Sequence, residues 1–413
     1  MAKAGPEDGT VAVPSAAPGP SARDWRIDFW RGLAIVFIFW NHSDNSVMSW
    51  LTTKYVGLSD SAELFVFLSG FAMASMFAAK FSARPRMAIP YCVGRAFTLY
   101  LHHITAFVVI AAFAVFYREW AGSSVVERDL FIRPFLLSTE TMLPKLATLA
   151  YLPPLLDILP LYILLTLMIG VLFTAFRDRI APYIGFAIVV WCFAWATGAT
   201  LSSYPDTRHW TFNPLCWQAV FLAGFVTFLI RDEPWLRRVM AAPATLALSI
   251  TIVIVGFVAA APWATAGFVE WRPLSILTDI ADKSFASPIR LVHFLAMAHI
   301  ATVFVKRESR LDLTFFGRWL VLIGRRSLPM FVISSVFAAF THGLFDWFNH
   351  AISVQVIYSL AMVGVLAGLA QVMDALGKVG RGGPPAPKQT RADPRARDPE
   401  PSPLRGMSAA AAS

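Results

Sequence analysis

Long apolar stretches recur along almost the whole chain, and they constrain its fold more than any other feature of the sequence. A helix needs about 20 residues to cross the hydrocarbon core of a bilayer. Within that core every backbone N–H and C=O must be hydrogen-bonded inside the protein, and a single apolar segment achieves this only as a helix. Such segments are predicted at residues 27–48, 60–79, 91–116, 155–176, 182–202, 213–230, 243–262, 287–305, 327–344 and 351–374. The sequence therefore predicts an all-α, polytopic integral membrane protein with about ten transmembrane helices.

The composition excludes an ordinary soluble domain. Of the 413 residues, 57% are hydrophobic and only 15% are charged, which is too apolar for a water-exposed surface. The formal net charge of +9 comes largely from the loops and the C-terminal tail, so we expect a lipid bilayer and no nucleic acid as partner. Cys92, Cys192 and Cys216 lie in apolar stretches without paired spacing, and neither a disulfide nor a metal site is predicted.

Both ends of the chain differ in composition from its apolar body. Residues 1–22 are rich in Ala, Pro, Gly and Ser, and residues 379–413 are rich in Pro, Arg, Gly and Ala. Segments that bury so little apolar surface do not order themselves. We predict disordered cytoplasmic tails at 1–22 and 379–413 around one transmembrane domain at 23–378. Because no apolar core precedes Arg23, the first span is expected to direct membrane insertion.

The distribution of basic residues predicts the orientation of these spans. If the N-terminus lies on the inner side of the membrane, the predicted inner turns carry thirteen Lys and Arg residues and the outer turns carry eight. Cytoplasmic loops carry the excess of positive charge, so both termini are expected in the cytoplasm. Residues 117–154 are interpreted as an outer loop with short interfacial helices. In the alternative, residues 129–143 dip through the membrane and every later span is inverted.

Ionisable residues within the first span are the strongest functional signal. Arg31 and His42 are eleven positions apart, which returns them to one helical face about 16 Å apart along the axis. Asp28 lies on that face as well. Charges inside a membrane helix usually face the bundle interior and mark a site, and His42 is a candidate general base. In the alternative, Asp28 and Arg31 form an ion pair, while Asn41 and His42 mark the outer interface.

The start of the second span supplies two carboxylates. Asp60 and Glu63 have the spacing of a capping box, in which both side chains bond to amides at the helix N-terminus. Glu63 is also predicted to lie near His42, because both residues fall toward the outer side. A carboxylate in that place would orient the imidazole and stabilise its charged form.

Arginines gather at the opposite, inner ends of the spans. Arg84, Arg86 and Arg95 follow the second span, and Arg325 precedes the ninth. The bias of positive charge toward the cytoplasm explains most of this cluster. Guanidinium groups also suit phosphate oxygens, so a phosphate site is the alternative interpretation.

Two later stretches add polar residues to apolar surroundings. Asn213 before Pro214 is a good N-cap, while Trp217 and Gln218 offer a stacking face and an amide to a sugar. Arg290 and His293 are predicted on one face of the eighth span, and Lys283 precedes that span.

Several separated motifs in a fixed order resemble a known family. They are Arg23-Asp-x-Arg-Ile-Asp-x-x-Arg-Gly32 with Asn41-His42, then Gly57 to Phe71, Phe212-Asn-Pro-x-x-Trp-Gln218, Lys283 to Ala296, and Gly324-Arg-x-Ser-Leu-x-Met-Phe331. With these motifs, residues 23–370 resemble the osmoregulated periplasmic glucan succinyltransferases, a branch of the type-three membrane acyltransferases.

This resemblance implies an O-acyltransferase in the bacterial inner membrane that moves an acyl group, typically succinyl, from acyl-CoA to a sugar hydroxyl. The donor succinyl-CoA is expected on the cytoplasmic side as a co-substrate, with no tightly bound cofactor, and the acceptor is a periplasmic glucan. His42, Arg31 and Glu63 are the predicted catalytic residues. The predicted substrate-binding residues are Asp28, Asn41, Arg84, Arg86, Arg95, Asn213, Trp217, Gln218, Lys283, Arg290, His293 and Arg325. The alternatives are a transporter or flippase, whose translocation path the same charges would line, and a glycan-binding subunit without chemistry.

Overall fold

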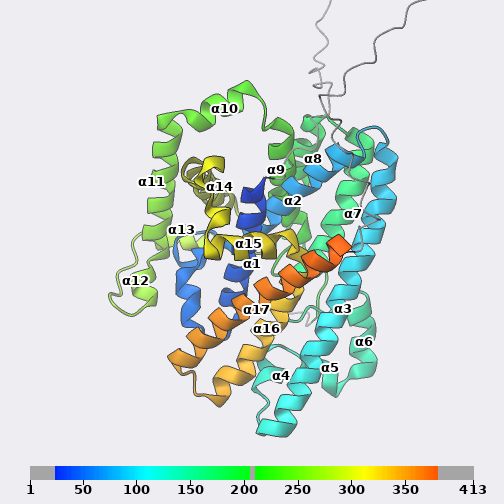
Figure 1. Cartoon of the computed structure of the whole chain (residues 1–413), viewed down its shortest axis with the longest axis vertical. Coiled ribbons are helices and arrows are strands. Elements are labelled where there is room, and N and C mark those ends of the chain that lie inside the picture. Colours follow the sequence, from blue (N-terminus) through cyan, green and yellow to red (C-terminus); the bar gives the residue numbers. More distant parts are fainter. Residues whose placement is uncertain (1–23, 205–209, 380–413) are drawn as a thin grey trace, which may run out of the picture.

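The computed structural model describes residues 24–204 and 210–379, and within them it contains helices, turns and no strand (Figure 1). The predicted N-terminal tail at 1–22 lies outside the described residues, as does the C-terminal tail after Val379. The predicted all-α fold class is confirmed for the described part of the chain.

Each of the ten predicted spans coincides with a helix. These helices are α1 (Trp25–His42), α2 (Ser61–Lys80), α3 (Ala88–Ala121), α7 (Ile158–Phe176), α8 (Ile180–Thr197), α9 (Pro214–Ile230), α11 (Pro243–Ala260), α14 (Pro288–Phe304), α16 (Ser327–Trp347) and α17 (Ile352–Val379). The shorter helices between them are α4 (Val125–Asp129), α5 (Arg133–Leu137), α6 (Thr139–Ala147), α10 (Pro234–Ala241), α12 (Pro262–Thr265), α13 (Ser275–Asp279) and α15 (Phe315–Arg325).

Fewer of these helices than predicted meet the length and hydropathy expected of a membrane span. Among the described residues, seven do so, namely α2, α3, α7, α8, α11, α16 and α17. An eighth is reached when α9 and α10, which meet at a bend of 109°, are counted together, and α14 is apolar but shorter. The chain is therefore a multi-helix membrane protein, whereas the count of ten spans and the cytoplasmic location of both termini stay predictions.

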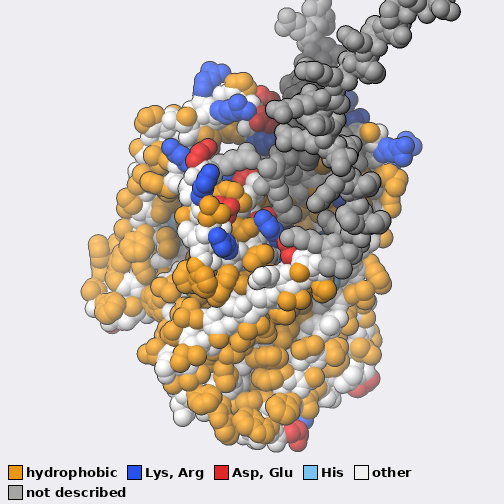
Figure 2. Space-filling model, in the orientation of Figure 1, with side chains coloured by type: hydrophobic (Ala, Val, Ile, Leu, Met, Phe, Trp, Pro, Cys, Tyr) orange, Lys and Arg blue, Asp and Glu red, His pale blue; other side chains and the backbone are white. Residues whose placement is uncertain are grey.

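The exposed surface supports a bilayer environment. Large apolar side chains are exposed along α3, α8, α11 and α17, and Figure 2 shows hydrophobic side chains covering most of the visible face below the charged groups near α10. Helices that are apolar on their outward face are placed against lipid. By contrast, α2, α7 and α16 are largely buried, so they form the interior that holds the polar side chains described below.

Two pairs of glycines bring the central helices into backbone contact. A side-chain carbon added at Gly32 of α1 would collide with the carbonyl oxygen of Leu320 in α15, and one at Gly324 would collide with that of Asp28. Small residues allow this close approach between membrane helices. Gly70 and Gly224 produce the same contact between α2 and α9. Helix α1 is therefore fixed against α15, and α2 against α9, near the middle of α1 and of α2.

The region of residues 117–154 is built as expected, with short helices after a long one. Helix α3 continues to Ala121, and α4, α5 and α6 follow it at the end of the molecule away from α10 (Figure 1). None of these three helices exceeds nine residues, whereas a span needs about 20. The alternative in which residues 129–143 cross the membrane as a helix is therefore not supported.

Helix α15 is a difference from the prediction, which treated residues 306–326 as an inner turn. Its eleven residues are amphipathic, with Gly317, Val321, Ile323 and Gly324 buried and Arg318 exposed. Eleven residues are too few to cross a bilayer, so a search for span-length segments does not detect them. Its buried face lies along α1, and this contact is made at Gly32 and Gly324.

The orientation can be tested with single cysteines at positions 235 and 347 in a chain lacking Cys92, Cys192 and Cys216. Trp235 lies in α10 and Trp347 ends α16, at opposite ends of the molecule (Figure 1). With both termini in the cytoplasm, we expect an impermeant thiol reagent added to intact cells to label position 347 and not position 235. Labelling at 235 with protection at 347 would invert the predicted orientation.

Candidate active site

A cavity of about 160 Å³ collects polar side chains at the C-terminal end of α1. Its walls come from α1, the first residues of α2 and α7 and the segments before them, the segments before α9 and α14, and α16. The lining residues are Ile38, Asn41, His42, Lys54, Asp60, Ser61, Ala62, Leu155, Asp157, Ile158, Phe212, Lys283 and Phe331. The structure thus brings together three predicted site residues, Asn41, His42 and Lys283.

His42 is the last residue of α1 and is partly buried. Helix α1 ends here because Ser43 adopts an extended conformation, and its backbone N–H and hydroxyl both donate to the carbonyl oxygen of Phe39. No hydrogen bond joins the His42 imidazole to any other residue in the described part of the chain. Its ring nitrogens are therefore available to a molecule in the cavity, as a general base requires.

A network of four charges lies beside His42. The Lys283 ammonium donates to Asp60 at 2.8 Å, and the Arg290 guanidinium lies 2.6 Å from Glu63 and 3.4 Å from Asp60. Burial opposes ionisation of Asp60, but Lys283 and Arg290 outweigh it and hold the pKa of this carboxyl below its ordinary value. Asp60 is thus an anion that fixes the position of Lys283 at the cavity.

The structure corrects the predicted partner of His42. Glu63 does not line the cavity; its carboxylate pairs with Arg290 and accepts the backbone N–H of Asp60 at 2.9 Å. The capping box is therefore present, with Asp60 accepting the N–H of Ala62 in return. Because the box turns Glu63 back toward the helix N-terminus, Asp60 takes the place in the cavity that the prediction gave to Glu63.

Two further polar groups of the lining differ in how they are held. The Asn41 side chain accepts a hydrogen bond from Thr52 at 2.6 Å and donates a longer one to Ser61 at 3.4 Å. Burial raises the pKa of Asp157, although a hydrogen bond from Thr211 and the charge of Lys283 oppose this rise. Asp157 is not among the predicted site residues, although a single carboxylate at the edge of an apolar stretch is the signal that identified Asp28.

A second cavity of about 230 Å³ surrounds Arg31. It is lined by Arg31, Phe65, Ser69, Ala72, Met73, Met76, Tyr91, Arg95, Leu99, Leu159, Tyr162, Thr166, Phe221, Ser327, Leu328 and Phe331. Arg31 donates to the hydroxyl of Ser327 in α16. Phe331 lines this cavity and the His42 cavity, and its ring stacks on Phe65 at 5.4 Å. The two cavities are therefore neighbours separated by an aromatic side chain.

The predicted cluster of inner arginines is divided in the structure. Arg95 lines the Arg31 cavity. Arg84 and Arg86 are exposed and line neither cavity. Arg325 lies 3.8 Å from the buried carboxylate of Asp28, which gives Asp28 a partner on α15.

Three predicted substrate-binding residues in α9 and at its N-cap are structural instead. Asn213 is fully buried and caps α9, and its amide also donates to the carbonyl oxygen of Ala199. Trp217 is fully buried and donates to the carbonyl oxygen of Lys283 at 2.8 Å. Gln218 is 2% exposed and donates to Ala187. A buried indole and amide offer no surface to a sugar. Trp217 and the backbone N–H of Asn213, which donates to Ser284, hold the Lys283 loop, whereas Gln218 joins α9 to α8.

Two predicted residues in α14 are also buried behind the cavity. Arg290 contributes to the ion pairs described above. His293 is 1% exposed, and its Nδ1 is 2.8 Å from the hydroxyl of Ser59. Its ring packs so closely on Gly57 that a side chain at that position would collide with it. Both residues position the chain before α2 and do not contact the cavity.

A group with metal-ligand chemistry lies outside the cavity. Within the described residues, Asp44, Asp129 and His342 place one potential ligand atom each within 4.8 Å of one another. His342 pairs with Asp129 at 3.5 Å, and Asp129 is exposed. An ion pair accounts for this arrangement, and we assign no metal to it.

Comparison with known proteins identifies a family. A model of the family described as OpgC protein matches residues 23–377, nearly all of the described chain. This match confirms the resemblance inferred from the separated motifs. No curated protein and no solved structure matches the chain.

Proposed function

The chain belongs to the OpgC protein family, and from this premise we propose that it transfers an acyl group, succinyl in the expected case, from coenzyme A to a hydroxyl of a periplasmic glucan. Family membership and the apolar helices indicate a membrane transferase that modifies glucan. The acyl group, the coenzyme A donor and the inner membrane location are part of the proposal.

The observation that carries this proposal is the imidazole of His42, which lines a cavity shared with Lys283 and Asp60 and has no hydrogen-bond partner among the described residues. A glucan hydroxyl in this cavity would give its proton to His42 as its oxygen attacks the thioester carbonyl. The tetrahedral intermediate then collapses, the carbon–sulfur bond breaks, and the leaving thiolate takes the proton from the imidazolium. The products are the glucan ester and coenzyme A.

Lys283 and Asp60 complete the proposed site. The ammonium of Lys283 lines the cavity and is held by an ion pair with Asp60 at 2.8 Å. A fixed positive charge stabilises the negative charge that develops on the carbonyl oxygen. Asp60 limits the movement of Lys283, so this charge is positioned before the substrate binds.

The two neighbouring cavities suggest how donor and acceptor meet. His42 ends α1, whereas Arg31 lies three turns earlier in the same helix. In the proposed arrangement, the donor enters from the Arg31 side and the glucan from the His42 side. The thioester then passes Phe331, which borders both cavities.

This arrangement makes Phe331 a determinant of acyl chain length. Replacing Phe331 by Ala is expected to join the cavities and admit longer acyl groups, because the Phe331 ring, stacked on Phe65, lines both of them. One methylene in an apolar pocket is discriminated by about 10- to 200-fold, and we expect this preference to fall about tenfold in the variant. The measurement is the ratio of kcat/KM for succinyl-CoA and its next longer homologue. Phe345→Ala is the matched control, since Phe345 is buried in the same helix and lines neither cavity. An equal change in both variants, or none in Phe331→Ala, would remove this role.

A transporter is the second candidate, because two polar cavities that follow one another along α1 also resemble parts of a translocation path. Purified protein separates the two functions. Release of coenzyme A from succinyl-CoA that depends on added glucan supports the transferase. Uptake of glucan or succinyl-CoA into protein-containing vesicles, without coenzyme A release, would establish transport instead.

A further inference from the structure

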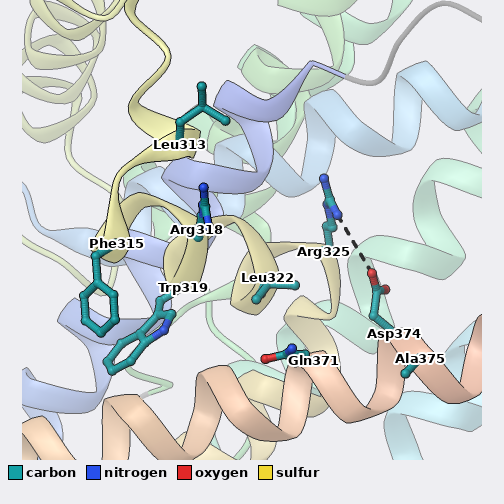
Figure 3. A pocket seen from close by; sticks show the side chains of 9 residues that line it. All are labelled: Leu313, Phe315, Arg318, Trp319, Leu322, Arg325, Gln371, Asp374 and Ala375. Carbon is teal, nitrogen blue, oxygen red and sulfur yellow. Dashed lines mark ion pairs between the residues drawn. The ribbon is translucent and has the colours of Figure 1, made fainter.

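A groove of about 680 Å³ lies between α15 and α17 (Figure 3). One wall is the exposed face of α15, and the other is the C-terminal part of α17 around Gln371 and Asp374. Its volume is within the range of small-molecule sites. None of the residues proposed above to act on the acyl group lines it.

Two arginines give the groove an anion-binding character. Arg318 and Arg325 are seven positions apart on α15, so they lie on one helical face, and Figure 3 shows both guanidinium groups on the same side of the helix. Arg318 is exposed and has no ion-pair partner among the described residues. Arg325 lies 3.8 Å from Asp28 and 3.8 Å from Asp374. At these distances most of its N–H donors remain available to phosphate oxygens.

The carboxylate in the groove is already neutralised. Asp374 pairs with Arg326 at 3.1 Å and accepts a hydrogen bond from its Nε at 3.2 Å. Arg326 does not line the groove, so it offsets Asp374 from outside. The charge that the groove presents to a ligand is therefore positive.

An aromatic side chain and an amide stand beside these cations. Trp319 is partly buried, packs on Phe315 at 4.6 Å and approaches α17 at Gly364. Gln371 is exposed on the facing helix. An indole stacks on a flat base, and an amide bonds to the donor and acceptor edge of a purine. Phosphate and purine groups thus have partners in one groove.

Neighbouring residues at the junction of α15 and α16 line the groove and the Arg31 cavity. Arg325 lines the groove, while Ser327 and Leu328, two and three residues later, line the cavity. Ser327 is also the residue to which Arg31 donates. A ligand with a phosphate end and a long flexible arm would occupy the groove and extend into the cavity.

We propose that this groove binds the adenosine diphosphate portion of the acyl donor, with Arg318 and Arg325 on its phosphates and Trp319 on its purine. The inference rests on the proposed function and assigns the donor nucleotide to α15 and α17. The sequence had placed the phosphate site at Arg84 and Arg86, but these residues line neither this groove nor the two cavities.

The test is an equilibrium titration of the full chain in detergent with adenosine 3′,5′-diphosphate. A lost charge-assisted contact weakens binding by about 10- to 100-fold, so we expect this loss in Arg318→Gln and a tenfold or larger loss in Trp319→Ala. Arg84→Gln and Arg86→Gln are the matched controls and are expected to bind as wild type does. Unchanged affinity in Arg318→Gln and Trp319→Ala, or loss confined to the controls, would overturn the assignment.

Two further measurements separate this inference from the proposed function and from a lipid site. In the assay of coenzyme A release, we expect Arg318→Gln to have a higher KM for succinyl-CoA and a kcat close to the wild-type value. If wild type turns over succinyl-CoA while the groove variants bind the nucleotide normally, the groove assignment fails and the function stands. If wild type binds the nucleotide through the groove without turnover, the function fails. A third outcome is that wild type retains phosphatidylglycerol, Arg318→Gln does not, and neither protein binds the nucleotide. This would identify a lipid headgroup site and overturn the proposal.

Discussion

Replacing His42 by Ala is expected to lower acyl transfer by about 10²- to 10⁴-fold, the contribution of a general base, while the protein remains folded. The imidazole lines the His42 cavity and makes no hydrogen bond to another described residue, so its removal leaves no hydrogen-bond partner unsatisfied. The measurement is the initial rate of coenzyme A release with succinyl-CoA and glucan, beside a gel-filtration profile in detergent.

His102→Ala is the control for this variant. His102 is a partly buried histidine whose Nδ1 contacts the carbonyl oxygen of Thr98 within α3, and it lines neither the His42 cavity nor the Arg31 cavity. We expect it to transfer at close to the wild-type rate. Wild-type transfer in His42→Ala would remove the imidazole from the mechanism.

Replacing Arg290 by Met is expected to have the largest effect on stability, a loss of about 3–5 kcal/mol in the free energy of unfolding. The guanidinium lies 2.6 Å from Glu63, which is 1% exposed, and 3.4 Å from Asp60. Its removal leaves the Glu63 carboxylate buried without its cationic partner. The midpoint of thermal unfolding in detergent measures this loss.

The double variant Glu63→Gln/Arg290→Met tests the reason for this loss. It removes both charges of the pair, while Asp60 keeps Lys283 at 2.8 Å, so most of the lost stability is expected to return. A single variant as stable as wild type would contradict a buried ion pair here. A double variant no more stable than the single one would show that packing by the Arg290 side chain was the cause.

Local sequence patterns predicted the parts of the site that local geometry determines. The helical period placed Arg31 and His42 on α1, and the Asp60-to-Glu63 spacing predicted the capping box that the structure contains. In both cases the relevant partners are within about three turns of one helix. The same patterns singled out Arg290 but did not predict its pairing with Glu63, 227 positions away, because such a contact depends on how α14 packs against α2.

Burial was the second property that the sequence did not determine. Trp217 and Gln218 have the chemistry of sugar-binding residues, but their helix packs with that face inward, and both are almost completely buried. The groove on α15 was missed for the opposite reason, since its helix is too short and too amphipathic to resemble a span. Asp157 was not predicted as a site residue because it is a single residue outside any motif. Only its position in the lining of the His42 cavity distinguishes it.

The most direct test of the central claim is the mass of the periplasmic glucans made by cells that lack the gene and carry it again on a plasmid. With the wild-type gene, we expect glucans heavier by whole numbers of succinyl groups, whereas the His42→Ala gene and the empty plasmid should both leave them unmodified. Glucans that carry the same acyl groups in all three strains, or unmodified glucans in the wild-type strain, would contradict acyl transfer at His42.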